Sequence, residues 1–389
     1  MTTPASAETM PKAAPEPNMA ARLGRIYRDP IWIDAILPTA ALRVVLLVAG
    51  VLAVVVFRPE ALPGSSVLDV WNRWDVPHFL EIARSGYGAP TDPARIVLLP
   101  LFPALIAIGS IVVNPLAAGM IVSFLATLGA AAGLYRLVQL DESPPTARGA
   151  VLAMNVFPTA FALVAAYSEA PFLALVVWAL VAGRRGDWRN AGLLTLLAGA
   201  TRLQGALLIP ALAFQYLVAR RRVGPDLAWL LLGLGGPAIY LGINEQIFGD
   251  PFRFLEVQRT IFGVQAAWPW TTIPSLIGGI LRGRPSEFWT TVYLMPVLAD
   301  ALLALVTIWA VLHRPFQPGL AALSFLNLVG FLVLSWPISV PRYLMGVPGV
   351  FVCLSVIGQR PVVAQTLLVG SVLLLGTFLT LFVIGHWAF

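Results

Sequence analysis

Residues 36–57 read ILPTAALRVVLLVAGVLAVVVF, an apolar run broken by a single arginine. About 20 apolar residues are enough for a helix to cross the hydrocarbon core of a membrane, so this run predicts the first membrane insertion. Similar runs recur along the whole chain, which is 58% hydrophobic and 11% charged with a mean hydropathy of +0.83. This composition excludes an ordinary soluble globule and predicts an all-α integral membrane protein.

The apolar runs predict a polytopic helical bundle with a long first extracytoplasmic loop. Each run is bounded by charged residues, proline or glycine; they cover 36–57, 96–113, 116–138, 149–166, 170–182, 191–200, 203–218, 227–243, 290–312, 320–334, 343–357 and 362–384. Two polar loops are long, 58–95 and 244–289. The second contains a short apolar piece, 272–281, which is too short to span and is expected to be re-entrant or interfacial.

Basic clusters predict the orientation, because arginines concentrate in cytoplasmic loops. The clusters are Arg22/Arg25/Arg28, Arg184/Arg185/Arg189, Arg220/Arg221/Arg222, His313/Arg314 and Arg360. The two long loops then lie outside. One of the runs 96–113 and 116–138 must be re-entrant or tilted, which leaves about 11 transmembrane helices. Residues 1–30 are expected to form a disordered cytoplasmic tail, and 31–389 a single membrane domain.

Several classes of function are not supported by the sequence. The net charge of +6 comes from arginines in short loops, so a nucleic-acid partner is not predicted. Cys353 is the single cysteine, and the three histidines are far apart, so neither a disulfide nor a zinc site is expected. No phosphate-binding glycine loop or paired-aspartate metal motif occurs. We predict no cofactor and assign no metal ligands; acidic residues of the outer loops could bind a divalent cation, but no spacing requires one.

The first long loop contains the densest polar stretch, WNRWDVPHFLEIARSGY at 71–87. Ionisable groups at the rim of a membrane domain are costly and are therefore candidates for chemistry. Aromatic and arginine side chains also anchor helices at the interface, but this does not explain Asp75 and His78 placed three residues apart. An ionised Asp75, with Arg73 or a protonated His78 as its cation, suits a general base. Alternatively, Asp75 caps a short helix over 76–83 with Pro77 in its first turn.

Two segments, 149–182 and 191–218, each predict a pair of short helices. Each pair has to cross the membrane and return within very few residues. Short helices at membrane depth are tolerated where the turn is buried in protein or lines a watery cavity. The tips of these pairs carry Tyr167-Ser168-Glu169 and Thr201-Arg202-Leu203-Gln204. Both tips should point outward, toward the loop that carries Asp75. The sequence therefore predicts that three polar clusters converge at one face of the membrane.

Each of the charged residues in these clusters and in the Pro341-Arg342-Tyr343 stretch has more than one interpretation. Glu169 could bind sugar hydroxyls, pair with Arg202 or favour the dipole of its helix. Arg202 requires an anionic partner, either Glu169 or a bound phosphate. Arg342 offers planar bidentate donors suited to a lipid phosphate; alternatively it is a snorkelling interfacial arginine.

Several short motifs occur in one order between about residues 70 and 350. They are WDVPHFLEIARSGY at 74–87, LPLFP at 99–103, FPTAF at 157–161 with YSE at 167–169, ATR at 200–202, FGDP at 248–251 and PRY at 341–343. This ordered set resembles the PIG-V-like mannosyltransferases. The resemblance implies a GT-C type membrane glycosyltransferase that takes sugar, usually mannose, from a polyprenyl-phosphate or dolichyl-phosphate donor and inverts the anomeric centre. It also implies that Asp75 is the catalytic base.

The expected function is therefore sugar transfer to a lipid, glycan or protein acceptor at the extracytoplasmic face of the cell membrane. Asp75 would deprotonate the acceptor hydroxyl. The expected donor-phosphate ligands are Arg202, Arg342 and Tyr343, and the expected sugar-binding residues are Trp74, His78, Tyr167, Glu169 and Gln204. Two alternatives remain open: a transporter or flippase of lipid-linked sugars, and a non-catalytic partner subunit.

Overall fold

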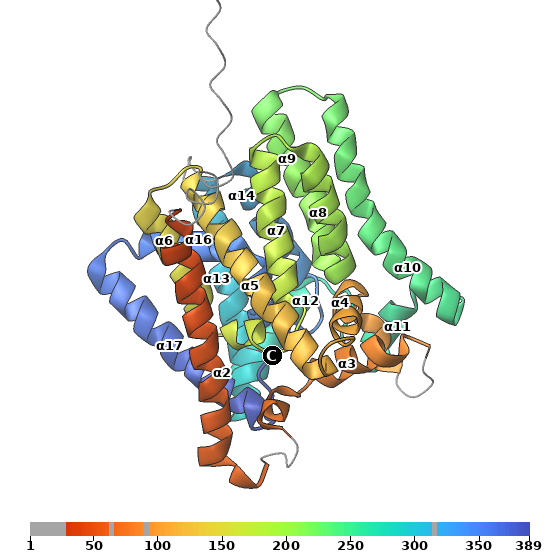
Figure 1. Ribbon diagram of the computed structural model, residues 1–389, viewed down its shortest axis with the longest axis vertical. Coiled ribbons are helices and arrows are strands. Elements are labelled where there is room, and N and C mark those ends of the chain that lie inside the picture. The colour runs from red at the N-terminus through yellow and green to blue at the C-terminus, as the bar shows by residue number, and fades with distance from the viewer. Residues whose placement is uncertain (1–28, 62–65, 89–92, 313–316) are drawn as a thin grey trace, which may run out of the picture.

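The computed structural model describes residues 29–61, 66–88, 93–312 and 317–389, which form a bundle of helices (Figure 1). Over these residues the predicted all-α class is confirmed, and the pairing of Ala266 with Leu334 is an isolated bridge. The α-helices are α2 (Leu37–Phe57), α3 (Asp75–Ser85), α4 (Leu101–Gly109), α5 (Pro115–Gln139), α6 (Pro144–Val156), α7 (Glu169–Arg184), α8 (Trp188–Thr201), α9 (Leu208–Arg220), α10 (Gly235–Phe248), α11 (Arg253–Thr260), α12 (Pro269–Arg282), α13 (Met295–Leu312), α14 (Pro318–Leu332), α15 (Val340–Tyr343), α16 (Pro348–Ile357) and α17 (Pro361–Val383). The tail 1–28, with Arg22, Arg25 and Arg28, lies outside the described residues, as do His313 and Arg314.

The predicted number of about 11 transmembrane helices is not confirmed. Within the described ranges, six helical stretches are long and apolar enough to cross a membrane, or seven if the α15–α16 pair, bent by 86°, is counted as one span. The difference arises from the short helices. Helices α4, α6, α7 and α8 have 9, 13, 16 and 14 residues, whereas one lipid-exposed span needs about 20.

The break between α6 and α7 lies inside the bundle and is stabilised by a buried arginine. Helix α6 ends at Val156, and the chain continues through a 3-10 turn, η5 (Ala160–Leu163), before α7 begins. Arg43 of α2 donates to the carbonyl of Ala160 at 2.8 Å and to the carbonyl of Asn155 at 2.7 Å. Backbone groups within the apolar interior must find partners, and a cation favours the carboxyl end of a helix. Arg43 therefore allows the chain to interrupt its helix here, a role that its place within an apolar run does not indicate.

The two long loops meet at one end of the bundle, where the turn η4 (Pro93–Val97) packs against α11 (Figure 1). Ile96 and Leu99 pack against Tyr240 and Phe254 in a small cluster of their own. The Tyr240 hydroxyl donates to the carbonyl of Ile96 at 2.6 Å. These contacts fix the chain immediately after the first long loop against α10 and α11. The side of the membrane on which this end lies stays a prediction.

Tyr87 closes the first loop in the same way, since its hydroxyl donates to the carbonyl of Leu98 at 2.6 Å. Burial, together with the nearby Tyr240, raises the pKa of Tyr87.

In the second loop, α12 contains the predicted piece 272–281 and is not among the candidate spans. Trp268 and Trp270, at its start, are stacked and largely exposed, a pattern typical of a helix at a membrane interface.

Candidate functional site

Two carboxylates and two arginines from four distant segments of the chain form one ionic network. Arg342, on α15, lies at its centre: Nη2 is 2.8 Å from Oδ2 of Asp75, and Nε is 2.9 Å from Oε1 of Glu169. Arg202, which follows α8, approaches the same Glu169 oxygen through Nη1 at 2.8 Å. The predicted convergence of Asp75, Glu169 and Arg202 is thus present, and Arg342 connects them.

The four side chains differ sharply in exposure. The side chain of Asp75 is 30% exposed, whereas Glu169, Arg342 and Arg202 are 3%, 6% and 14% exposed. The two acids balance the two guanidinium groups, which is what permits so many charges to be buried together. Asp75 is therefore the most accessible member of the network.

The pairing of Glu169 rests on charge and distance more than on aligned hydrogen bonds. Its Oε1 atom is buried without an aligned donor, although nitrogens of Arg202 and Arg342 lie within 2.9 Å. Glu169 is also the first residue of α7, where a negative charge favours the helix dipole. The structure thus shows two of the three interpretations of Glu169, namely pairing with Arg202 and a place at the helix start.

Asp75 begins α3 without capping it. The N-cap position is occupied by Trp74, and no side-chain hydrogen bond caps the helix. The capping interpretation of Asp75 is therefore wrong, and its carboxylate turns to Arg342 instead. Pro77 does lie in the first turn, as expected. The helix runs to Ser85, where Gly86 takes a positive φ of 67° that suits glycine.

The backbone of Trp74, immediately before Asp75, has an unusual conformation, with φ 55° and ψ −111°. Positive φ is rare for residues other than glycine and costs about 1–3 kcal/mol. Such strain persists only where the surroundings enforce it, and it is concentrated at functional sites. The strain lies next to the accessible carboxylate of the network.

Arg73 does not pair with Asp75, contrary to our expectation. Its Nε atom donates to the carbonyl of Val383 at 3.2 Å, at the end of α17. Burial, and then the charge of Arg58, lower the pKa of Arg73. The cation beside Asp75 is Arg342, which we had assigned to a donor phosphate. His78 lies on α3 and is half-buried; its role toward a sugar stays a prediction.

Arg202 lies in a tight turn that also orients Gln204. Nη1 of Arg202 donates to Oγ of Ser168 at 3.1 Å, and Nε donates to Oε1 of Gln204 at 3.3 Å. Gln204 in turn donates to Oδ1 of Asn327 at 2.8 Å. Asn327 is buried within an apolar helix, α14, where no motif or spacing indicates a role at the site. The turn requires Gly205, because a Cβ there would lie 2.3 Å from backbone atoms of α8.

Aromatic rings flank both guanidinium groups. The Tyr167 ring lies 4.7 Å from Cζ of Arg342, and the Tyr343 ring lies 4.6 Å from Cζ of Arg202 and 5.8 Å from Cζ of Arg342. Contacts of this kind attract a cation to the ring face and restrict its orientation. Tyr167 is fully buried. Both tyrosines were predicted site residues, and the structure places both against the network.

Within the described residues, no group of three or more His, Cys, Asp or Glu side chains is arranged to hold a metal ion. Cys353 is buried and unbonded.

No protein-family model matches the sequence, and no curated protein matches it. Among solved structures, the fold is similar to the oligosaccharyltransferase of Archaeoglobus fulgidus. The apo form aligns with a TM-score of 0.46 and 13% identity over 89% of this chain and 54% of that protein. The complex of AglB from the same organism with an inhibitory peptide and a dolichol-phosphate aligns with a TM-score of 0.48 and 13% identity over 88% and 56%. This chain therefore spans little more than half the length of those proteins.

Proposed function

We propose that this protein is an inverting glycosyltransferase. It would move a sugar, with mannose as the first candidate, from a polyprenyl-phosphate donor to a lipid, glycan or protein acceptor at the extracytoplasmic face. The observation that supports this best is the arrangement of one accessible carboxylate, Asp75, in front of the buried group of Arg342, Glu169 and Arg202. A general base and a nearby cation are the two elements that displacement of a phosphate by a hydroxyl needs.

In this mechanism Asp75 accepts the proton of the acceptor hydroxyl as its oxygen attacks the anomeric carbon. The bond from that carbon to the phosphate oxygen breaks, its electron pair stays on the phosphate, and the configuration at carbon inverts. Before the reaction, Asp75 neutralises part of the charge of Arg342, 2.8 Å away. When Asp75 takes the proton, that charge becomes available at the moment when negative charge develops on the departing phosphate. Stabilisation of this kind favours the transition state over the ground state.

The remaining site residues have supporting parts in the proposal. Glu169 keeps two arginines in one place, and the rings of Tyr167 and Tyr343 restrict their rotation. Arg202 would assist Arg342 at the phosphate. We assign Trp74, His78 and Gln204 to the sugars because they neighbour the network in sequence, and the acceptor itself is left open among lipid, glycan and protein.

The test is transfer from radiolabelled polyprenyl-phosphate-mannose to crude membrane lipids and proteins, catalysed by the purified protein in vesicles. We expect Asp75→Asn to fold and to bind donor but to lose about 10²- to 10⁴-fold in turnover, the range for a lost general base. The matched control is Asp226→Asn. Asp226 is exposed, pairs with Arg220 at 3.8 Å, and lies in the connection between α9 and α10 at the opposite end of the bundle (Figure 1).

Near-normal transfer by Asp75→Asn would overturn the assignment of the base. Movement of lipid-linked sugar across the vesicle membrane, without any new covalent product, would instead identify a transporter or flippase.

A further inference from the structure

The residues after α17 cross over the first loop beside the candidate site. We call residues 384–389 the strap. It turns at Gly385, where φ is +88°, and its end is buried, with the Phe389 ring 4.8 Å from the ring of Phe378. Arg58 donates to the carbonyl of Ile384 at 2.6 Å. The strap is therefore fixed both to the first loop and to α17.

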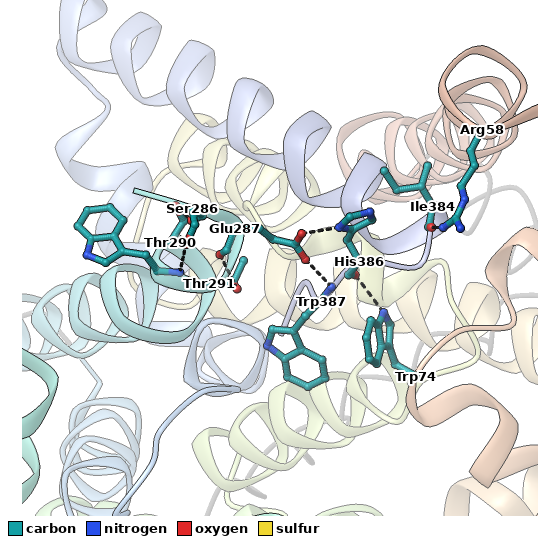
Figure 2. A network of polar contacts seen from close by, with 10 residues as sticks. Arg58, Trp74, Ser286, Glu287, Thr290, Thr291, Ile384, His386 and Trp387 are labelled. Carbon is teal, nitrogen blue, oxygen red and sulfur yellow. Dashed lines mark hydrogen bonds and ion pairs between the residues drawn. The ribbon is translucent and has the colours of Figure 1, made fainter. Parts of the chain in front are cut away.

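The strap holds the strained Trp74 by two contacts. The indole nitrogen of Trp74 donates to the carbonyl of His386 at 3.1 Å. The ring of Trp74 also meets the ring of Trp387 edge to face, with centroids 5.0 Å apart. Figure 2 shows the two indoles side by side below His386. Because Trp74 directly precedes Asp75, these contacts act on the backbone that aims the carboxylate.

Glu287, from the second long loop, anchors the strap. One carboxylate oxygen contacts Nδ1 of His386, and the other accepts from the backbone N–H of Trp387 at 3.0 Å (Figure 2). Glu287 is itself held at the start of a helix, because its carbonyl accepts from Thr291 Oγ1 at 2.9 Å. The anchor thus comes from the helix that continues into α13 and not from a free loop end.

We propose that Glu287 and the strap are positioning elements that hold Trp74 in its strained conformation and so aim Asp75 at Arg342. None of the strap residues needs to touch substrate for this role. The chain of contacts runs from Glu287 through the backbone of residues 386 and 387 to the indole of Trp74, and then along one peptide bond to Asp75. The part of the proposal that concerns turnover rests on the proposed function of Asp75.

The test compares four variants of the full chain with the wild type. Glu287→Ala removes both anchor contacts, whereas Glu287→Gln keeps an acceptor for the Trp387 N–H and serves as the rescue. Trp74→Phe removes the indole donor and reduces the ring that meets Trp387, so it weakens both contacts of Trp74 with the strap. The matched control is Glu245→Ala, at an exposed position of α10.

The first measurement is amide hydrogen exchange across the start of α3, which does not depend on any enzymatic activity. We expect Glu287→Ala and Trp74→Phe to speed exchange there at least tenfold, with α5 unchanged and with the control and Glu287→Gln near wild type. Unchanged exchange at α3 in both variants would overturn the proposal, whatever the activity. If Glu287→Ala does not fold, Trp74→Phe alone decides this point.

The second measurement is the split between kcat and the KM for the polyprenyl-phosphate sugar. We expect kcat to fall about 10- to 100-fold in Glu287→Ala, the loss typical of a small misplacement of a reacting group, with KM unchanged and kcat largely restored in Glu287→Gln. Faster exchange at α3 with normal kcat would refute the positioning role. Absence of sugar transfer by the wild type would refute the proposed function instead, and the exchange measurement would still test the strap.

Discussion

The same chemical change at the two carboxylates of the network should have opposite consequences. Glu169→Gln removes a charge whose side chain is 3% exposed and which faces Arg202 at 2.8 Å and Arg342 at 2.9 Å. Removing one partner of a buried ion pair typically costs about 3–5 kcal/mol, because the other charge stays buried without compensation. The lost acid at the start of α7 adds about 0.3–1 kcal/mol. We expect a total loss of about 3–6 kcal/mol in the free energy of unfolding, which is a shift of roughly a hundredfold or more in the folding equilibrium.

Asp75→Asn should cost far less stability. The Asp75 side chain is 30% exposed, and solvent reduces the contribution of a partly exposed pair to about 1 kcal/mol or less. Arg342 also keeps its contact with Glu169. The loss in this variant should fall on turnover, by the 10²- to 10⁴-fold expected for a general base. Stability and activity therefore separate between the two variants.

The assay is unfolding by a denaturing detergent, followed by tryptophan fluorescence and circular dichroism, beside sugar transfer by the same preparations. Glu256→Gln is the control, since Glu256 pairs with Arg253 on exposed α11 and should change stability by less than about 1 kcal/mol. A Glu169→Gln variant as stable as this control would show that the buried network is not paired as described. Equal destabilisation by Glu169→Gln and Asp75→Asn would refute the distinction drawn from their exposure.

Three further predictions concern the framework of the site. Arg43→Met should destabilise the fold by about 2–6 kcal/mol, because the carbonyls of Asn155 and Ala160 lose their donor and each buried unsatisfied group costs about 1–3 kcal/mol. Detergent unfolding checks this, and a neutral effect would exclude the role of Arg43 at the helix break. Gly205→Ala should cost about 1–3 kcal/mol by overpacking against α8 and should also weaken the Arg202 turn; wild-type stability would contradict the close approach. Burial raises the pKa of Tyr87 above its value in the unfolded chain, so the contribution of Tyr87 to stability is complete below about pH 10 and is lost as the pH rises further. The free energy of unfolding, measured between about pH 9 and 12, should therefore depend less steeply on pH in Tyr87→Phe, and an unchanged slope would refute this.

The sequence predicted the helical membrane class because apolar runs of spanning length are a direct physical signal. It also predicted that Glu169 and Arg202 would face Asp75, since both lie at breaks between helices too short to span. The predicted number of about 11 spans is not confirmed, because it counts short runs as crossings. A run of apolar residues does not reveal whether its helix faces lipid or is packed inside the bundle, as α7 is.

The contacts that organise the site could not be predicted from the sequence. Arg43 and Asn327 lie within apolar runs, and nothing in their spacing shows which distant backbone or side chain they meet. The partner of Asp75 was misassigned because the nearest cation in sequence, Arg73, turns to α17, whereas Arg342 arrives from a distant segment. The role of Glu287 depends on a third element, the strap, and only the folded arrangement brings them together.

The ion pairs of Arg342 with Asp75 and Glu169 affect how a donor phosphate would be recognised. A bare buried guanidinium would bind the donor phosphate strongly in the ground state, and this binding would not accelerate the reaction unless it increased in the transition state. In this protein the charge of Arg342 is already shared between Asp75 and Glu169, so attraction for the intact donor is reduced. Proton transfer to Asp75 would remove one of these two partners as the leaving group gains charge. In the proposed mechanism, the ion pairs that neutralise Arg342 in the ground state therefore make Arg342 selective for the transition state.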